Sequence, residues 1–333
     1  MKRVEVKSPG GLDNLVVNEI DFDFAPKPFE VLVRWHATSL NFHDYLVAKG
    51  AIPVSDGRVP MSDGAGEVIA IGANVSQWKT GDKVMSLFFP NWIDGKVSMG
   101  KTRAISGESF HGYAVEKSLI DENSLTSIPE GFTYAEAATL PCAALTAWRG
   151  LFVEGGLQPG DSVLIEGSGG MSIFALQLAK AAGAKVYATT SSSEKAVRLK
   201  SMGVESVVNY KEDPKWGKTL FKMTGGIDHV LDVGGGITMN QSIEAVAVGG
   251  HITSIGILGG RKGEITFPKL FFKHVRLTGI AVGSREMQMA MVKAINQSDW
   301  RPIIDKSFGL NELADAFSYQ ETGKHFGKIV VEY

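Results

Sequence analysis

A glycine-rich turn between a strand-like run and a helical run constrains the fold of this chain more than any other feature. Residues 162–166 (SVLIE) have the apolar composition of a buried strand, and residues 171–182 repeat apolar side chains at helical spacing. Between them the chain reads Gly167, Ser168, Gly169, Gly170, Met171 and Ser172. Gly167 allows a tight turn, Gly169 lets the backbone approach a pyrophosphate, and the small Ser172 lets helix and strand pack closely. The positive end of the helix dipole and its free N–H groups would then face the phosphates.

Strand-like and helical runs alternate from this turn onward. We expect strands at 162–166, 185–189, 204–208, 229–233, 251–257 and 275–282, and helices at 171–182, 194–202, 216–223, 238–246, 268–273 and 285–296. Such alternation is typical of a doubly wound parallel sheet with helices on both faces, the Rossmann architecture. Ligands of these sheets bind at the carboxyl ends of the strands. That rule adds five positions to the expected dinucleotide site: Gly234, Gly256, Ile257, Gly283 and Ser284.

The first part of the chain has a different pattern. Short strands are expected at 4–7, 15–20, 30–37, 66–72, 83–87 and 112–116, separated by glycine, proline and aspartate. Many short strands of irregular spacing indicate a small, partly open β-barrel. Helical runs follow at 134–139 and, after a break at Pro141, at 143–152. The final run, 328–332, is a strand that no helix follows, and we expect it to return to the first domain.

These runs predict an α/β protein of two domains, which agrees with a length of 333 residues. A partly open β-barrel domain would comprise residues 1–124 and be completed by residues 298–333. A Rossmann doubly wound parallel sheet domain would comprise residues 125–297.

Composition excludes several classes of protein. The 34 Lys and Arg against 36 Asp and Glu give a net charge of −2, which argues against a generally basic nucleic-acid binder. The single cysteine, Cys142, excludes an intrachain disulfide and a zinc site of several cysteines, and it fits a reducing compartment. The sequence shows no apolar signal region and no apolar run near the roughly 18–20 residues of a membrane span. We expect a soluble protein of the cytoplasm.

The residues after the expected strand 185–189 bear on which dinucleotide binds. NAD sites usually have an Asp or Glu about 20 residues beyond the glycine turn, where it holds the ribose 2′-hydroxyl. Here the strand runs into Thr190, Ser191 and Ser192, and no acidic residue ends it. Lys195 follows one turn into the next helix. Because hydroxyls and a lysine can bind a 2′-phosphate, we expect NADPH as the cofactor.

Six motifs, in order along nearly the whole chain, resemble the medium-chain dehydrogenase/reductase superfamily and, more closely, its zinc-independent quinone oxidoreductase-like branch. They are 39–44 (SLNFHD), 61–68 (MSDGAGEV), 78–84 (WKTGDKV), 139–148 (TLPCAALTAW), 167–172 (GSGGMS) and 208–210 (VNY). The resemblance implies a GroES-like barrel around an inserted Rossmann domain, with hydride transfer from NADPH in the cleft between them. It implies that Tyr210 joins Ser191, Ser192 and Lys195 at the 2′-phosphate, and that Lys328 lies near the cofactor. It also implies a homodimer, in which the apolar edge strand 275–282 pairs across a two-fold axis.

The resemblance also bears on metal binding. Zinc-dependent relatives hold their catalytic metal with Cys, His and Cys, and the matching positions here are Asn41, Ser62 and Cys142. One soft ligand does not make a tetrahedral zinc site, so we expect no metal. A non-standard set of His43, Asp44, Asp63 and Cys142 is the alternative.

Without a metal, side chains must stabilise or protonate the oxygen that becomes negative when hydride is transferred. Asn41 could offer an amide N–H at the vacated metal position, and Thr146 could offer a hydroxyl near the nicotinamide. His43 has a suitable unperturbed pKa for proton donation, near ~6.5, and Tyr45 is a second candidate donor. The loops at 48–60 and 88–109 are expected to supply the substrate walls.

The leading hypothesis is an NADPH-dependent oxidoreductase that transfers hydride, without zinc, to a quinone, an enone or a related activated carbonyl compound. A second hypothesis is a zinc-free NADP-dependent alcohol dehydrogenase or carbonyl reductase. A third is a non-enzymatic NADPH-binding sensor. The partners expected are a small-molecule substrate and a second copy of the chain, with neither a membrane nor a nucleic acid.

Overall fold

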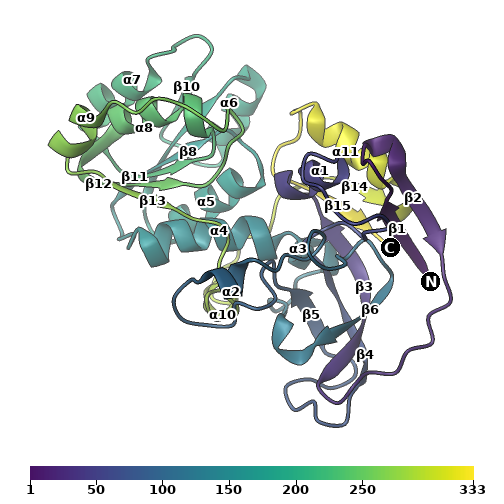
Figure 1. Cartoon of the computed structure of the whole chain (residues 1–333). Coiled ribbons are helices and arrows are strands. Elements are labelled where there is room, and N and C mark those ends of the chain that lie inside the picture. The colour runs from purple at the N-terminus through teal and green to yellow at the C-terminus, as the bar shows by residue number, and fades with distance from the viewer. The chain divides into compact units, whose positions relative to one another are not determined.

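The computed structural model describes all residues from 1 to 333, and their contacts divide the chain into two units. The terminal unit contains both chain ends and comprises Met1–Leu145 and Val282–Tyr333. The central unit comprises Thr146–Ala281. Figure 1 colours the chain by residue number, so the two ends of the terminal unit are purple and yellow. Each unit is described by itself.

The central unit contains a six-stranded parallel sheet in the order β10-β9-β8-β11-β12-β13. Its strands are β8 (Ser162–Glu166), β9 (Lys185–Thr190), β10 (Ser206–Asn209), β11 (Ile227–Asp232), β12 (Val246–Ser254) and β13 (Arg276–Gly279). Its helices are α5 (Gly170–Ala181), α6 (Ser193–Ser201), α7 (Trp216–Thr224), α8 (Met239–Ala245) and α9 (Phe267–Phe272). This order places the first strand in the middle and reverses there, which confirms the expected doubly wound parallel sheet.

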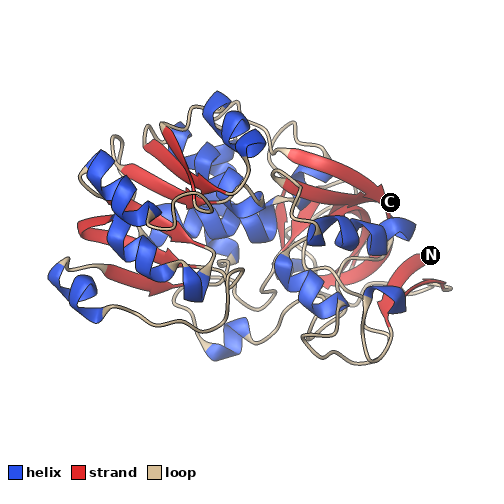
Figure 2. Cartoon of the chain, turned by 90° about the horizontal axis from the view of Figure 1, so that it is seen from above, coloured by secondary structure: helices blue, strands red, loops and turns tan.

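Apolar side chains explain why these strands pair in the interior. Leu164, Val230 and Ile252 come from three neighbouring strands and are fully buried, and Leu220 of α7 and Ile243 of α8 pack in the same cluster. A parallel sheet must be covered on both faces, so its central strands are continuously apolar. Figure 2 shows helices on both faces of this sheet.

The terminal unit contains a seven-stranded sheet in the order β14-β15-β3-β4-β5-β7, with β6 paired to β3. Its strands are β3 (Glu30–Ser39), β4 (Ala65–Ile71), β5 (Lys83–Ser86), β6 (Lys117–Asp121), β7 (Leu125–Ser127), β14 (Ile304–Gly309) and β15 (Lys328–Glu332). A two-stranded sheet of β1 (Lys2–Val6) and β2 (Leu15–Glu19) accompanies it. Because β15 pairs antiparallel with β3, the last strand does return to the first domain as expected.

Short helices surround the sheet of the terminal unit. They are α1 (Phe42–Ala48), α2 (Met99–Thr102), α3 (Tyr134–Ala138), α10 (Arg285–Ile295) and α11 (Leu313–Glu321). Trp35, Val68 and Val84 from the strands and Phe317 from α11 are buried in one core cluster. No helix in the structure is long and apolar enough to cross a membrane.

Two local expectations were wrong. Residues 112–116 form no strand: only an isolated bridge joins Arg3 to Val115, and the regular strand β6 begins at Lys117. Pro141 does not break the helical path either. It stands in the first turn of a π-helical segment, Leu140–Ala144, that leads into α4 (Leu145–Trp148). Proline fits there because the first N–H groups of a helical segment have no intrahelical partner to lose.

The contacts divide the chain at other positions than the predicted boundaries of 124/125 and 297/298. Helix α3 packs against β3, β4 and β5, and α10 packs against β7, so both helices belong to the terminal unit. Gln288 attaches α10 to the terminal unit. Its buried amide donates to the carbonyl oxygen of Ser86 at 2.9 Å and to the hydroxyl of Thr126 at 2.7 Å.

Candidate functional site

The glycine-rich turn of the central unit has the backbone that a phosphate site requires. Strand β8 ends at Glu166, and Gly167 follows with a left-handed φ of 73°. Gly169 precedes α5, and a side chain at either glycine would meet no atom within 4 Å, so the space above the turn is open. The hydroxyl of Ser172 donates to the carbonyl oxygen of Glu166 at 2.7 Å, which ties helix to strand. Gly170 and Met171 are the first residues of α5, and Ser168 is buried beside them.

The residues expected at a 2′-phosphate meet at one edge of the sheet. Asn209 of β10 is in register with Thr190 of β9, and the N–H of Tyr210 donates to the carbonyl oxygen of Thr190 at 3.1 Å. Ser192 is the N-cap of α6 and accepts from the N–H of Lys195 at 3.3 Å. Ser191 lies between these groups in sequence, and Tyr210 is 42% exposed. The structure therefore brings Ser191, Ser192, Lys195 and Tyr210 to neighbouring strand ends.

Three further expected cofactor positions lie at the ends of β11 and β12. The N–H of Gly259 donates to the carbonyl oxygen of Gly234 at 2.8 Å, so the two loops run side by side. A side chain at Gly256 would lie 2.4 Å from the carbonyl oxygen of Val233, which explains glycine there by backbone packing. Ile257, which follows Gly256 in the chain, is 40% exposed.

Two other expected cofactor positions and the expected catalytic residue Thr146 are more enclosed. Gly283 and Ser284 belong to the terminal unit, where the buried hydroxyl of Ser284 caps α10 by accepting from the N–H of Met287 at 3.2 Å. Thr146, in α4, is also buried.

A buried polar cluster in the terminal unit contains Asn41, Asp63 and Lys328, which we call the lysine cluster. The ammonium of Lys328 donates to the carbonyl oxygen of Leu40 at 2.6 Å and to Oδ1 of Asn41 at 2.7 Å. The amide Nδ2 of Asn41 donates to Oδ2 of Asp63 at 2.8 Å and to the hydroxyl of Ser62 at 3.3 Å. Both N–H groups of Asn41 therefore already have partners. One of them must give up its partner before Asn41 can donate to the oxygen of a substrate. The ammonium of Lys328, a residue expected near the cofactor, therefore holds the side chain of Asn41.

The electrostatics of the lysine cluster follow from its burial. Asp63 is fully buried, and its Oδ1 has no hydrogen-bond partner in the structure. Burial raises the pKa of Asp63 to about 7, although the charge of Lys328 opposes the rise. Burial also lowers the pKa of Lys328 and raises that of the Cys142 thiol, so Cys142 is not an activated nucleophile. An acid and a base whose pKa values are shifted toward neutrality are typical of sites that move protons.

His43 lies next to this cluster on α1 and is held between two carboxylates. Its Nε2 lies 2.7 Å from Oε2 of Glu108, and its Nδ1 lies 3.7 Å from Oδ1 of Asp44. Burial lowers the pKa of His43, but Asp44 and Glu108 together outweigh burial and raise it above its usual 6.5. Asp44 is itself fixed, because it accepts from the N–H groups of Ser62 and Asn41. The imidazolium form that can donate a proton is therefore favoured.

Tyr45 has different partners from His43. Its hydroxyl donates to Oε1 of Glu321 at 2.7 Å and accepts from the ammonium of Lys49 at 2.6 Å, and both of these residues are exposed. The structure thus directs the Tyr45 hydroxyl toward the surface and not toward Asn41.

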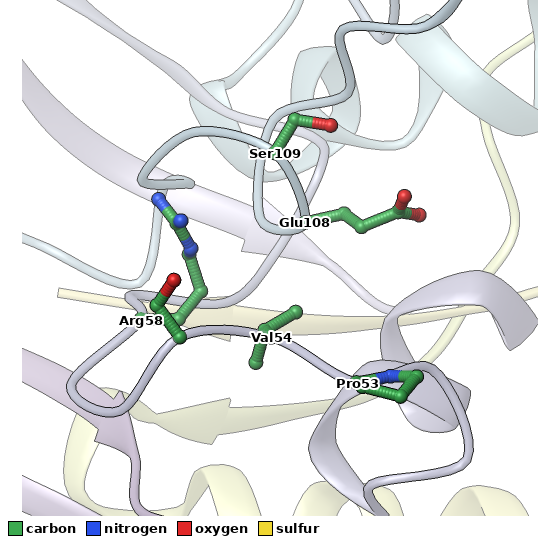
Figure 3. A pocket seen from close by; sticks show the side chains of 6 residues that line it. Pro53, Val54, Arg58, Glu108 and Ser109 are labelled. Carbon is green, nitrogen blue, oxygen red and sulfur yellow. The ribbon is translucent and has the colours of Figure 1, made fainter.

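Glu108 also lines a pocket of about 520 Å³ (Figure 3). It is lined by Pro53, Val54, Ser55, Arg58, Glu108 and Ser109, which come from the two loops expected to supply substrate walls. In Figure 3 the side chains of Arg58 and Glu108 rise from different loops on opposite sides of Val54. Glu108 was not singled out from the sequence, because it lies in an irregular loop and belongs to no motif.

No group of three or more His, Cys, Asp and Glu side chains in the structure could hold a metal ion. The alternative metal set of His43, Asp44, Asp63 and Cys142 is therefore not assembled. At the positions of the zinc ligands, Asn41 and Ser62 bond to each other and to Asp63 instead. The donor set does not fit zinc.

Comparisons with known proteins agree in both parts of the chain. Residues 27–142 match the alcohol dehydrogenase GroES-like domain, and residues 170–297 match the family described as zinc-binding dehydrogenase. The zinc-type alcohol dehydrogenase-like protein C1773.06c of Schizosaccharomyces pombe is 38% identical over 97% of this chain and 96% of that protein. The acryloyl-coenzyme A reductase of Sulfurisphaera tokodaii is 27% identical, with complete coverage of both chains. A crystal structure of an NAD-dependent alcohol dehydrogenase superposes with a TM-score of 0.91 at 31% identity, also over all of both chains.

Proposed function

The chain belongs to the medium-chain dehydrogenase/reductase superfamily and is an oxidoreductase, and on this premise we propose that it uses NADPH to reduce an enone, quinone or related activated carbonyl compound without zinc. The observation that carries the proposal is the lysine cluster. A buried ammonium bonds to Asn41, the residue that the resemblance matches to the first cysteine ligand of zinc relatives. We therefore propose that Lys328 and Asp63, whose pKa values are both shifted by burial, take the place of a metal that would otherwise polarise the substrate.

NADPH is proposed on the residues that end β9 and β10. The glycine turn of 167–172 would hold the pyrophosphate, and Ser191, Ser192, Lys195 and Tyr210 would hold the 2′-phosphate. Glu194, the nearest acid, is exposed at the start of α6 and leaves the strand end without a carboxylate. A similar structure is named NAD-dependent, so NAD is the competing cofactor.

The bound nicotinamide would supply hydride, and the chain's own residues would deal with the charge that hydride transfer leaves. Addition of hydride to the β-carbon of an enone produces an enolate, which must take up one proton to give the saturated product. His43 is the proposed donor, because Asp44 and Glu108 hold its ring and favour its protonated form. The positive charge of Lys328, transmitted through Asn41, would stabilise the enolate oxygen.

Reduction of an activated C=C bond is favoured over reduction of a simple carbonyl by two observations. A full-length relative is named for acryloyl-coenzyme A, an α,β-unsaturated thioester. In addition, the donor set does not fit the metal that would polarise an unactivated carbonyl. The competing carbonyl reductase function is favoured by two other names, a zinc-type alcohol dehydrogenase-like protein and an NAD-dependent alcohol dehydrogenase.

The test is a screen of NADPH oxidation over quinones, enones, unsaturated thioesters, aldehydes and ketones, followed by product analysis. An α,β-unsaturated ketone should yield the saturated ketone, whereas a carbonyl reductase would yield the allylic alcohol. Binding of NADPH with no turnover of any acceptor would instead favour the sensor hypothesis.

A homodimer is proposed on the edge of the central sheet. Strand β13 ends the strand order, and Leu277 on it is 38% exposed. Phe271 and Phe272 of α9, which precedes β13, are also exposed. An apolar edge strand favours pairing with another chain. Light scattering at micromolar concentration should give the mass of a dimer, and a monomeric mass would contradict the proposal.

A further inference from the structure

Two buried carboxyl groups lie directly beneath the glycine turn, and neither belongs to the sites described above. Glu166 is the last residue of β8, and Asp232 is the last residue of the neighbouring strand β11. Glu166 is 5% exposed and Asp232 is 0% exposed. Neither acid forms a salt bridge with an ammonium or guanidinium group. Asp63 differs from them, because the charge of Lys328 acts on it.

Ser242 of α8 joins the two acids. Its hydroxyl oxygen lies 2.9 Å from Oε1 of Glu166 and 2.7 Å from Oδ2 of Asp232. A serine hydroxyl has one hydrogen, so it can donate to only one of these oxygens. The other hydrogen bond needs a proton on a carboxyl group, since two carboxylates and one hydroxyl would leave a pair of acceptors in contact.

The remaining partners indicate which acid carries the proton. Asp232 accepts from the N–H of Gly235 at 2.8 Å and from the hydroxyl of Thr238 at 2.9 Å, in addition to Ser242. Glu166 accepts from the N–H groups of Val233 and Gly234, both at 3.1 Å, but only through Oε2. Its Oε1 has no other donor than Ser242. Asp232 is therefore the acid better stabilised as an anion, and Glu166 is the acid that needs a proton.

We propose that Glu166 carries a proton at neutral pH, donates it to Ser242, and through Ser242 and Asp232 positions the Val233–Gly235 backbone beneath the dinucleotide site. In this chain of bonds, Oε1–H of Glu166 donates to Ser242, and the Ser242 hydroxyl donates to Asp232. The neutral Oε2 still accepts from Val233 and Gly234. Glu166 is thus a positioning residue, and its proton joins the ends of β8, β11 and α8.

The surroundings support a neutral acid. Burial, together with the charge of Asp232, raises the pKa of Glu166 to about 8. Thr189 of β9 is in register with Glu166, and Ser172 of α5 bonds its carbonyl oxygen, and neither side chain carries a charge. Asp232 is the one charged group that acts on Glu166, and it favours the protonated form.

The decisive variant is Glu166→Gln. A glutamine Oε1 can accept from Val233 and Gly234 while its amide donates to Ser242, so it reproduces the protonated acid. The exposed Glu205→Gln serves as the matched control for loss of one negative charge in the same unit. This inference concerns the chain's own protons, so its test needs no substrate and its failure leaves the proposed acceptor untouched.

The experiment compares unfolding in denaturant from pH 5 to pH 9. A carboxyl whose pKa rises from 4.5 to about 8 on folding binds more protons in the folded state, so wild type loses stability as pH rises across that interval. The unfolding constant of wild type relative to Glu166→Gln should therefore increase by up to about tenfold per pH unit and level off above pH 8. The ratio for Glu205→Gln should stay flat. NADPH affinity should fall above pH 8 in wild type and remain constant in Glu166→Gln.

The proposal would be overturned if the ratio of the two unfolding constants did not change with pH. It would also be overturned if Glu166→Gln were less stable than wild type at every pH. Infrared spectroscopy of wild type gives a second decision if the variant fails to fold. A protonated carboxylic acid C=O band at pH 7 that disappears near pH 9 is expected. Its absence at pH 7 would show that both acids are ionised.

Discussion

Buried acids occur in both units, and they are accommodated in different ways. In the terminal unit, Asp63 shares Asn41 with the ammonium of Lys328, so an opposite charge lies within the same network. In the central unit, Glu166 and Asp232 share only the hydroxyl of Ser242. An ionised carboxyl removed from water needs either a counter-charge or several donors, and otherwise it takes up a proton. We expect the first arrangement to retain its charges for chemistry, and the second to hold one proton on Glu166 and to fix the backbone.

We expect the two units to have different tasks. Side chains of the terminal unit are expected to act on the substrate, and those of the central unit to bind and orient the cofactor. Variants in the first should therefore change turnover, and variants in the second should change affinity.

Replacement of His43 by alanine should have the largest effect. A positioned acid contributes ~10²–10⁴ in rate, so kcat should fall by about that factor while the NADPH dissociation constant is unchanged. Steady-state kinetics and a binding titration measure the two quantities. Tyr45→Phe is the matched control, because its hydroxyl bonds to surface residues, and it should retain turnover. A loss below about threefold in His43→Ala would assign the proton to another donor.

Substitution of a buried acid by its amide should change the free energy of unfolding differently for Asp63 and for Glu166, most clearly at pH 8. Asp63→Asn removes the carboxylate charge that acts most strongly on the buried ammonium of Lys328, and it should cost about 3 kcal/mol of unfolding free energy. Glu166→Gln should cause no loss of unfolding free energy at pH 8. The loss in Asp63→Asn should be smaller at pH 5, where Asp63, with its pKa raised to about 7, is already protonated.

The double variant Asp63→Asn with Lys328→Met removes both charges and should recover most of the lost stability, as denaturant unfolding can measure. If Asp63→Asn and Glu166→Gln behave alike at both pH values, the distinction between a charge-balanced and a proton-sharing cluster is wrong.

Lys195→Ala should weaken NADPH binding by roughly tenfold to a hundredfold, since a charge-assisted bond to phosphate contributes ~1.5–3 kcal/mol. Fluorescence titration measures the dissociation constants of NADPH and NADH. The NADH value should barely change, because NADH has no 2′-phosphate, and the exposed Lys200→Ala of the same helix should alter neither. Equal weakening of both cofactors would remove the basis for NADPH preference.

Glu108→Gln should have the smallest effect and should be visible as a shift in the pH profile. Glu108 helps to raise the pKa of His43, so its neutralisation lowers that pKa. The rate falls as the donor loses its proton with rising pH, and this alkaline limb should move to lower pH in the variant. A limb that stays in place would separate His43 from the rate-limiting proton transfer.

The sequence predicted what depends on local pattern. Apolar periodicity placed most strands of the central sheet within a few residues, and the turn at Gly167 required glycine for a backbone reason that the observed positive φ bears out. The lysine cluster could not be assembled in this way. Lys328 is 287 residues from Asn41, and only the pairing of β15 with β3 brings them together. The proton-sharing pair had no motif either, because Ser242 meets Glu166 only when α8 packs over the sheet.

The central claim is metal-free, NADPH-dependent reduction of an activated double bond. The most direct test is to assay metal-stripped protein, with its zinc content measured, on an α,β-unsaturated ketone with NADPH and to identify the product. We predict substoichiometric zinc, activity that survives the chelator, and the saturated ketone as the product. One tightly bound zinc per chain that is lost together with activity, or the allylic alcohol as the product, would contradict the account.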